Sequence, residues 1–495
     1  MIRQGFDNEK YLAMQSDHIR ERISHFGDKL YLEFGGKLFD DYHASRVLPG
    51  FEPDSKLRML MQLADQAEIV IAISAEDITK NKVRYDLGIT YDVDVLRLIR
   101  VFTDRGLTVG SVVITHYVDI PAVVQFKHKL EKLGVKVYRH YAIEGYPGNV
   151  PLIVSDEGYG KNDYIETSRP LVVVTAPGPG SGKMATCLSQ LYHENKRGVK
   201  AGYAKFETFP VWYLPLKHPV NLAYEAATAD LNDVNMIDPF HLEAYGKTTV
   251  NYNRDVEIFP VLSAIFEGIF GECPYKSPTD MGVNMAGFCI FDDEACQEAS
   301  RQEIIRRYYQ ALEKLVKDDA SENEAYKIEL IMKQARITPE NRSVVPAATK
   351  LAEEIQAPAA ALELPDGRIV LGKTKKLLGA SAAVLLNAIK ELGGIDHELD
   401  LISPEAIAPI QELKVRYLGS INPRLHTDEV LIALSACAAH DEHARIALEQ
   451  LPKLRGCQVH TTVLLSDVDK KIFKKLGIDL TCEPVHEDKK MNADN

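Results

Sequence analysis

The sequence predicts an α/β protein with a Rossmann-like, doubly wound N-terminal domain, and two observations lead to this class. Between residues 29 and 175, short runs rich in β-branched residues alternate with helical stretches, which is typical of parallel strands joined by crossover helices. The last of these runs leads into a glycine-rich, P-loop-like turn and then into a helix. A helical subdomain and a smaller C-terminal α/β domain are expected to follow.

The expected elements of the N-terminal domain follow from the spacing of its apolar residues. Strands are predicted at 29–34, 68–74, 111–117, 135–141 and 171–175. Stretches 55–67 and 123–133 carry apolar residues at helical spacing, so they are expected to be crossover helices.

The remaining chain is expected to form two further domains. Residues 294–337 place Ile304, Ile305 and Leu312 on one helical face, which predicts a helical subdomain or the face of a homodimer. Later strands are predicted at 361–364, 368–371 and 458–465, with helices at 347–355, 381–392 and 427–454. We therefore predict a Rossmann-like domain at 1–225, a mixed and helical subdomain at 226–345, and a C-terminal α/β domain at 346–495.

Composition narrows the class of protein. The net charge of -13 disfavours a nucleic-acid binder, which needs clustered Lys and Arg. The 7 cysteines are widely spaced without a Cys-x-x-Cys pair, so we expect reduced thiols. The polar start and the lack of an apolar run of about 18 residues argue against export and membrane spanning, which leaves the cytoplasm as the expected compartment.

The strongest local signal is segment 172–186, which reads Val-Val-Val-Thr-Ala-Pro-Gly-Pro-Gly-Ser-Gly-Lys-Met-Ala-Thr. Glycines let successive backbone N–H groups converge on an anion, and a lysine at the start of the next helix can reach a terminal phosphate. The predicted phosphate-binding residues are Gly178, Gly180, Ser181, Gly182, Lys183 and Thr186. The segment departs from a P-loop at Pro177, in place of the first glycine, and at Met184, where a hydroxyl would hold Mg²⁺. The alternative is a Gly/Pro turn with an incidental lysine.

A second basic glycine turn lies at 371–381, between an expected strand and an expected helix. Lys373 and Thr374 could hold another anion there, including the other end of the same ligand. A hairpin turn with solvated lysines explains the segment equally well.

Acidic residues close three expected strands. Segment 287–294 is predicted to be an apolar strand that ends at Asp292 and Asp293, which would supply a metal contact beside a bound phosphate. The alternative role for these acids is capping the helix that follows. Segments 74–77 and 155–157 are further candidates by position alone. Asp156 precedes Gly158 and Gly160, which favours a plain turn at the second of them.

Peptidase chemistry finds little support in the sequence. His193 lacks the second histidine of an H-E-x-x-H motif, and no G-x-S-x-G elbow occurs. His440 and His443 flank two acids between expected helices, a pattern that fits an exposed polar turn better than a zinc site.

Four segments stand out when they are taken together: Glu-Phe-Gly-Gly-Lys-Leu from residue 33, the glycine turn from residue 175, Gly-Lys-Thr from 372 with Leu-Leu-Gly-Ala-Ser from 377, and Gly-Ser-Ile-Asn-Pro-Arg from 419. With these segments the chain resembles a conserved bacterial family of functionally uncharacterised proteins with a P-loop-like N-terminal domain. The resemblance covers essentially the whole chain. It implies a Rossmann-like domain with a nucleotide-binding-like loop, followed by smaller domains, and no established activity. Some family members carry an ATP-dependent peptidase label.

Three functions stay open at this point. The first is an enzyme, such as an NTP-dependent transferase, that uses ATP or another nucleotide with Mg²⁺. The second is a non-catalytic sensor of a phosphorylated small molecule, which Met184 favours. The third is an ATP-dependent peptidase.

Overall fold

A computed structural model describes residues 3–27, 29–36, 38–39, 41–84, 87–317 and 322–487. Lys37, in the Glu-Phe-Gly-Gly-Lys-Leu segment, lies outside these ranges. The chain forms two compact units. The sheet unit consists of Gln4–Glu225 and Asn232–Gln297, and the C-terminal unit consists of Met1–Arg3, Ala226–Leu231 and Glu298–Asn495. The division into three domains stays a prediction.

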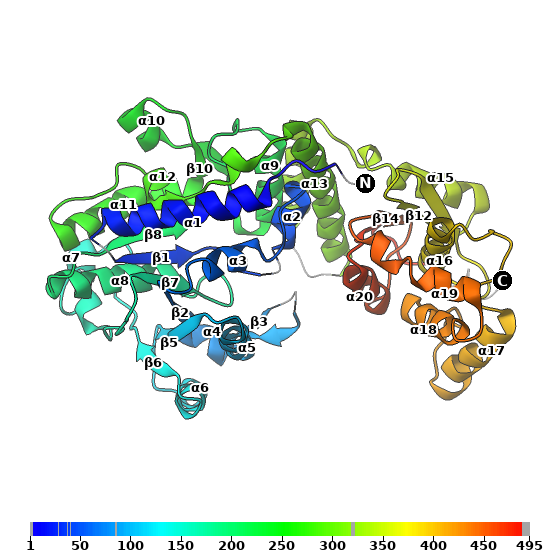
Figure 1. Cartoon of the computed structure of the whole chain (residues 1–495), viewed down its shortest axis with the longest axis horizontal. Helices are drawn as coiled ribbons and strands as arrows, with labels where there is room; N and C mark the ends of the chain where they lie inside the picture. Colours follow the sequence, from blue (N-terminus) through cyan, green and yellow to red (C-terminus); the bar gives the residue numbers. More distant parts are fainter. Residues whose placement is uncertain are drawn as a thin grey trace. The chain divides into compact units, whose positions relative to one another are not determined.

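The sheet unit is built on seven strands that all run parallel, in the order β11-β8-β1-β7-β2-β5-β6 (Figure 1). Their bounds are β1 (Leu30–Phe34), β2 (Ala67–Ser74), β5 (Thr108–Thr115), β6 (Lys136–Arg139), β7 (Leu171–Thr175), β8 (Gly202–Phe206) and β11 (Gly282–Val283). Every residue of β1, β2 and β7 is buried, as expected for central strands covered on both faces. The predicted α/β class is confirmed, and the parallel sheet is compatible with a Rossmann-like domain.

Helices cover both faces of this sheet. Helix α8 (Lys183–Lys196) packs against β1, β7 and β8, and α11 (Asn253–Phe270) packs on α8, so that face holds a large apolar core. On the opposite face Phe34 and Phe206 stack with ring centroids 4.1 Å apart, and Lys56 of α3 (Ser55–Met61) lies over the Phe206 ring. The sheet is therefore buried on both sides, and its strand ends are the places where polar groups can gather.

The other elements of this unit are mostly short. The helices are α1 (Asn8–His25), α2 (Tyr42–Val47), α4 (Ala75–Thr79), α5 (Tyr91–Asp104), α6 (Pro121–Lys132), α7 (Val150–Ile153), α9 (Pro219–Ala227), α10 (Pro239–Tyr245) and α12 (Pro278–Met281). Two antiparallel pairs join β3 (Val83–Arg84) to β4 (Ile89–Thr90) and β9 (Asn235–Ile237) to β10 (Val250–Tyr252). No helix in the described part of the chain has the length and apolar character that a membrane crossing requires.

The C-terminal unit has its own four-stranded sheet, in the order β13-β12-β14-β15. Its strands are β12 (Ala359–Glu363), β13 (Ile369–Lys373), β14 (Gln458–Thr461) and β15 (Asp479–Cys482). Its helices are α14 (Glu322–Ala335), α15 (Val344–Ile355), α16 (Ala380–Gly393), α17 (Pro404–Glu412), α18 (Thr427–Cys437), α19 (Glu442–Leu448), α20 (Asp467–Leu476) and most of α13 (Asp293–Val316). Ala361 packs against α15, whereas Leu362 packs in the core that contains α16, so β12 is buried on both faces. A homodimer contact on α13 and α14 stays a prediction.

Two expected strand ends are not strands. The apolar segment before Asp292 forms a short 3-10 helix, Ala286–Cys289, with only one bridge residue, Ile290, paired to Phe6. Phe288 and Phe291 are exposed there, so the apolar run does not mark a buried strand. Segment 155–157 follows the helix α7 rather than a strand.

Candidate functional site

The glycine turn lies where the strand connections of the sheet diverge. From β7 the chain passes through α8 to β8, toward one edge of the sheet. From β2 it passes through α5 to β5, toward the opposite edge. Strands β7 and β2 are neighbours. In open α/β sheets, ligands bind beside the carboxyl ends of strands at such a divergence.

The turn between β7 and α8 has a backbone that only glycine adopts readily. Gly180 has φ +77° and Gly182 has φ +79°, both in the left-handed region. The Ser181 hydroxyl donates to the Gly178 carbonyl at 3.0 Å, and the Thr115 hydroxyl donates to the Ser181 carbonyl at 2.9 Å. These bonds occupy two carbonyl groups of the loop and hold the loop against the end of β5.

The same turn leaves a run of backbone donors without acceptors. Among the described residues, no group accepts a hydrogen bond from the N–H of any residue in 180–185, and the first N–H to be paired is that of Thr186, with Gly182. Gly180 is exposed. Successive unpaired N–H groups at the start of a helix attract an anion through their partial charges and the helix dipole.

The carboxyl end of β2 lies beside this turn. A Cβ on Gly178 would stand 2.2 Å from the Tyr91 hydroxyl, so only glycine fits against that ring. The Lys82 ammonium lies 4.9 Å from the Tyr91 ring centroid and pairs with Asp77 Oδ1 at 3.1 Å. Asp77 Oδ2 is buried and has no hydrogen-bond partner within the described ranges. The predicted acidic end of β2 is thus close to the glycine turn.

Lys183 begins α8 and is partly exposed. Its ammonium forms no ion pair or hydrogen bond with the residues that the structure describes. Burial raises the pKa of the Cys187 thiol one turn later, Glu33 raises that pKa further, and Lys183 lowers it. The positive charge of Lys183 is therefore close enough to affect the pKa of a thiol on the α8 face of the sheet. Thr186, in contrast, is fully buried.

A charged cluster that the sequence analysis did not identify lies two strands away. Lys205 of β8 pairs with Glu207 Oε1 at 2.9 Å and with the Asp255 carboxylate of α11. Burial raises the pKa of Glu207 to about 7, Lys205 opposes this rise, and Asp255 adds to it. Burial alone would lower the pKa of Lys205, but the carboxylates of Asp255 and Glu207 raise it. The sequence did contain a signal for this cluster, namely a lysine inside a strand whose other residues are buried.

Asp292 and Asp293 have the contacts of a helix start. Asp292 Oδ1 accepts a hydrogen bond from the Ala295 N–H at 3.2 Å, and Asp293 Oδ1 lies 3.0 Å from His218 Nε2. The contacts found for these acids in the described part of the chain lie at the start of α13 and on His218, not on the glycine turn. No group of three or more His, Cys, Asp or Glu in the described part of the chain could hold a metal ion. The magnesium assignment stays a prediction.

Lys373 and Thr374 belong to the C-terminal unit. Gly372 and Lys373 are the last residues of β13 rather than part of the turn, and Lys373 is exposed. The Thr374 hydroxyl accepts a hydrogen bond from the Ala380 N–H at 3.2 Å, which satisfies a donor at the start of α16. Their anion-binding role stays a prediction.

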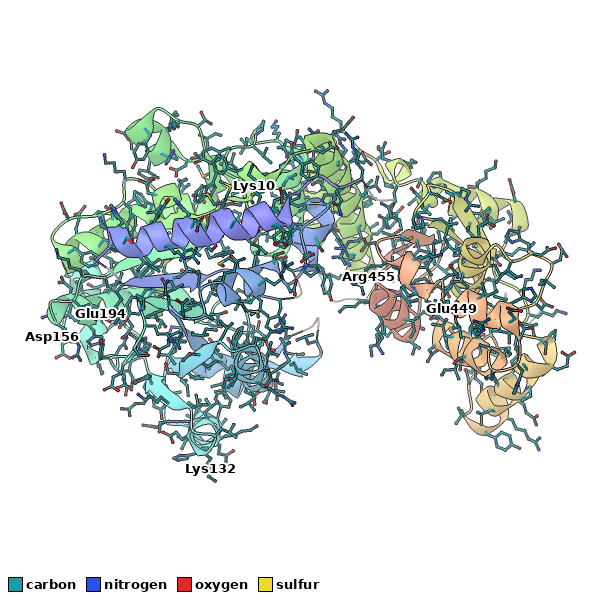
Figure 2. The ribbon with its side chains drawn as sticks, viewed as in Figure 1. Lys10, Lys132, Asp156, Glu194, Glu449 and Arg455 are labelled. Atoms are coloured by element: carbon teal, nitrogen blue, oxygen red, sulfur yellow. The ribbon has the colours of Figure 1, made fainter. Side chains whose placement is uncertain are left out.

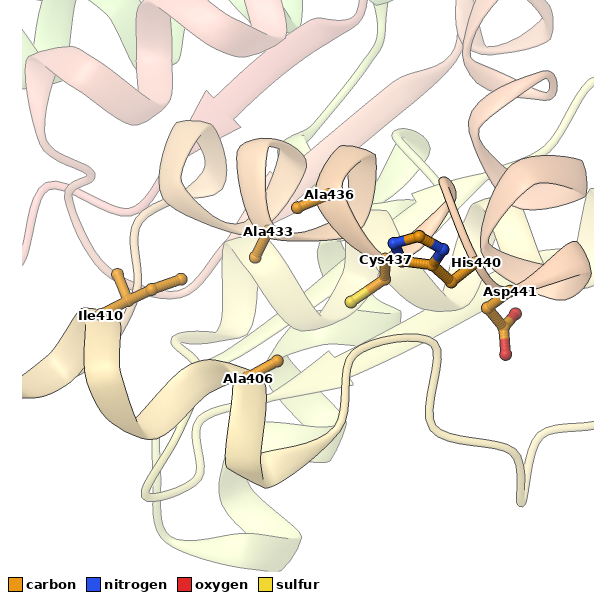
Figure 3. Close-up of a pocket in the computed structure, with 7 residues that line it drawn as sticks. All are labelled: Ala406, Ile410, Ala433, Ala436, Cys437, His440 and Asp441. Carbon is orange, nitrogen blue, oxygen red and sulfur yellow. The ribbon is translucent and has the colours of Figure 1, made fainter.

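The C-terminal unit also has an apolar groove between α17 and α18, with a volume of about 440 Å³ (Figure 3). It is lined by Ala406, Ile410, Ala433, Ala436, Cys437, His440 and Asp441. Asp441 Oδ1 accepts a hydrogen bond from the Ala444 N–H at 2.8 Å, so this acid caps α19. The predicted polar turn is confirmed, because His440 is exposed in the turn at 438–440 that separates α18 from α19.

Comparison with known proteins identifies the family. A domain of unknown function, DUF1846, N-terminal, matches residues 4–336, and its C-terminal counterpart matches residues 340–492. UPF0371 proteins of Corynebacterium urealyticum and Streptococcus thermophilus are each 59% identical over 481 and 487 residues, which is 97% and 98% of this chain and 97% and 99% of theirs. A UPF0371 protein of Corynebacterium aurimucosum is 60% identical over 482 residues, 97% of each chain. The resemblance seen in the sequence is confirmed, and the chain belongs to the DUF1846 family of UPF0371 proteins.

Proposed function

We propose that this protein binds a nucleotide or another phosphorylated small molecule, with a phosphate group on the turn formed by residues 178–183. The observation that carries the proposal is the run of N–H donors at 180–185, which lack acceptors among the described residues at a divergence of strand connections. The left-handed glycines allow these donors to converge, and Lys183 adds a positive charge. Such a turn is suited to phosphate oxygens, which accept several hydrogen bonds at once.

Phosphoryl transfer is a further step that this site supports less well. In P-loop enzymes the hydroxyl after the lysine holds Mg²⁺, and here that position is Met184. A thioether is a poor ligand for this hard cation. Binding without catalysis, as in a sensor of a phosphorylated metabolite, is therefore the second candidate function, and an NTP-dependent transferase would need its metal contacts from other residues.

The first prediction concerns Lys183. We expect a phosphorylated ligand to raise the melting temperature of the wild type, because a ligand at about 100 times its Kd stabilises the folded state by about 2.7 kcal/mol. In Lys183→Ala the affinity should fall at least about tenfold, since a charge-assisted hydrogen bond is lost. Thermal shift against ATP, GTP, pyrophosphate and sugar phosphates, followed by calorimetric titration, measures both effects.

Lys132→Ala is the matched control for this experiment. Lys132 is an exposed lysine at the end of α6 (Figure 2), and like Lys183 it forms no ion pair within the described residues. It should bind ligand as the wild type does. Equal stabilisation of the wild type and Lys183→Ala by every ligand would refute the phosphate site.

The second prediction concerns magnesium. With methionine at position 184, we expect the affinity for free inorganic phosphate or pyrophosphate to change less than about twofold when EDTA replaces Mg²⁺. Met184→Thr restores the hydroxyl that a P-loop uses, so this variant should bind pyrophosphate more tightly with Mg²⁺ than with EDTA. Strong Mg²⁺ dependence in the wild type would instead favour the enzyme over the sensor.

A further inference from the structure

We propose that Lys205, Glu207 and Asp255 form the second half of this site and that Glu207 exchanges a proton with the end of the ligand remote from its phosphate. The inference rests on the proposed function and adds the chemistry of the ligand: a phosphorylated small molecule that also carries a hydroxyl or amino group. The two halves of the site lie at the carboxyl ends of parallel strands, β7 and β8.

The register of the strands sets the distance between the halves. Glu33 of β1 stands opposite Val174 of β7 on one side and Lys205 of β8 on the other. Neighbouring strands lie about 4.8 Å apart, so Val174 and Lys205 are about 10 Å apart across the sheet. The turn at 178–183 begins four residues after Val174, and Glu207 lies two residues after Lys205. A small metabolite with its phosphate on the turn can span this distance.

Charged and aromatic groups face Glu207 from several elements. Lys205 of β8 forms an ion pair with Glu207, and Asp255 of α11 raises the pKa of Glu207. The charge of Glu207 in turn raises the pKa of Tyr252, which precedes α11. A Cβ on Gly282 of β11 would stand 3.1 Å from Glu207 Oε2 and 2.4 Å from Trp212 Cζ2, so carboxyl and indole meet there.

The indole N–H of Trp212 faces the same carboxyl. Trp212 is 5% exposed, its Nε1 atom is buried, and its N–H lowers the pKa of Glu207 as a hydrogen-bond donor to that carboxyl. Protonation of Glu207 weakens this hydrogen bond, because a neutral carboxyl is a poorer acceptor than a carboxylate. The indole N–H can then donate to an oxygen atom of a ligand beside Glu207.

The balance of charge favours a proton on Glu207. The single ammonium of Lys205 faces the carboxylates of Glu207 and Asp255, and the charge of Glu33 also raises its pKa. Because burial raises the pKa of Glu207 to about 7, both of its forms are populated near neutral pH. The proton can pass from Glu207 to the lone pair of an uncharged amino nitrogen of the ligand, whereas a hydroxyl oxygen would accept it only as a hydrogen bond. The carboxylate that remains keeps its ion pair with Lys205.

The only tryptophan of the chain provides the measurement. Trp212 fluorescence, titrated with pH, should show a transition near pH 7 in the wild type. Glu207→Gln, which keeps the shape of the side chain, should abolish it, and Asp255→Asn should move it to lower pH because Asp255 raises the pKa of Glu207. Glu257→Gln, an exposed acid on α11, should leave it unchanged.

Titration with inorganic phosphate tests whether the two halves belong to one site. At a separation of about 10 Å, a phosphate charge on the turn would raise the pH of the Glu207 transition by up to about one unit, and Lys183→Ala should remove this shift but not the transition itself. A transition that persists in Glu207→Gln would belong to another group, such as His43 or His218, and would overturn the inference. Lys183-dependent binding of phosphate without any shift would also overturn it and leave the proposed function standing. No Lys183-dependent binding would overturn the proposed function and this inference together.

Discussion

Replacing Lys205 with methionine is expected to lower the free energy of unfolding by about 3–5 kcal/mol at pH 8. Methionine keeps most of the side-chain volume, but it leaves the carboxylates of Glu207 and Asp255 without their cation. Removing one partner of a buried ion pair is costly because the remaining charge is poorly solvated. Urea denaturation followed by Trp212 fluorescence measures the loss in the sheet unit, and Lys132→Met is the control at an exposed lysine.

The loss should depend on pH in a defined direction. Glu207 has a folded pKa of about 7, above the ordinary value of 4.5, so its favourable contribution is full below about pH 4.5 and is lost as the pH rises through 7. Without Lys205 that pKa rises further, so Lys205→Met should be less destabilising at pH 5 than at pH 8. Adding Glu207→Gln to Lys205→Met should recover part of the stability at pH 8. An equal loss at both pH values would contradict the role given to the ion pair.

The second large effect is expected at Gly372 of β13. A Cβ there would stand 2.3 Å from the Val384 nitrogen and 2.7 Å from the Ala380 oxygen, both in the backbone of α16. Gly372→Ala must therefore push the helix away from the strand, at a cost of about 3 kcal/mol. Differential scanning calorimetry should show the C-terminal unit unfolding at a lower temperature.

Gly379→Ala is the matched control, seven residues further along the same segment. Its φ is -72°, and the nearest atom to an added Cβ is Ser381 Oγ at 4.0 Å. Alanine is a poorer residue than glycine at a helix start, so a cost of about 0.5–1 kcal/mol is expected. If both alanine variants melted alike, the close packing of β13 on α16 would not be the reason for glycine at 372.

The sequence predicted the central strands because their residues are apolar without interruption. Runs such as Leu171–Thr175 are buried on both faces, and this pattern is local. The same reasoning missed β8, whose lysine and glycine break the run, although a charge within a buried strand is itself a signal for a functional site. It also missed α5, where Val95, Leu98 and Phe102 lie at helical spacing.

The sequence predicted one half of the proposed site, the glycine turn, but not the cluster around Lys205. The glycine turn is one continuous segment, so its residues could be named. The row of Val174, Glu33 and Lys205 exists only because β7 and β8 flank β1 in the sheet, and no local pattern encodes strand order. The strand predicted at 287–294 is wrong, because acids that follow a strand and acids that cap a helix have the same sequence pattern.

The two edges of the seven-stranded sheet bear on how the chain behaves at high concentration. A sheet edge exposes unpaired N–H and C=O groups, which can pair with another molecule and start aggregation. One edge is β6, four residues that begin with an exposed lysine, Lys136, and end with Arg139 in an ion pair with Asp163. The other edge is β11, a strand of only two residues. The most apolar strands of the chain thus lie in the interior of the sheet, and neither edge offers a long apolar template for fibril growth.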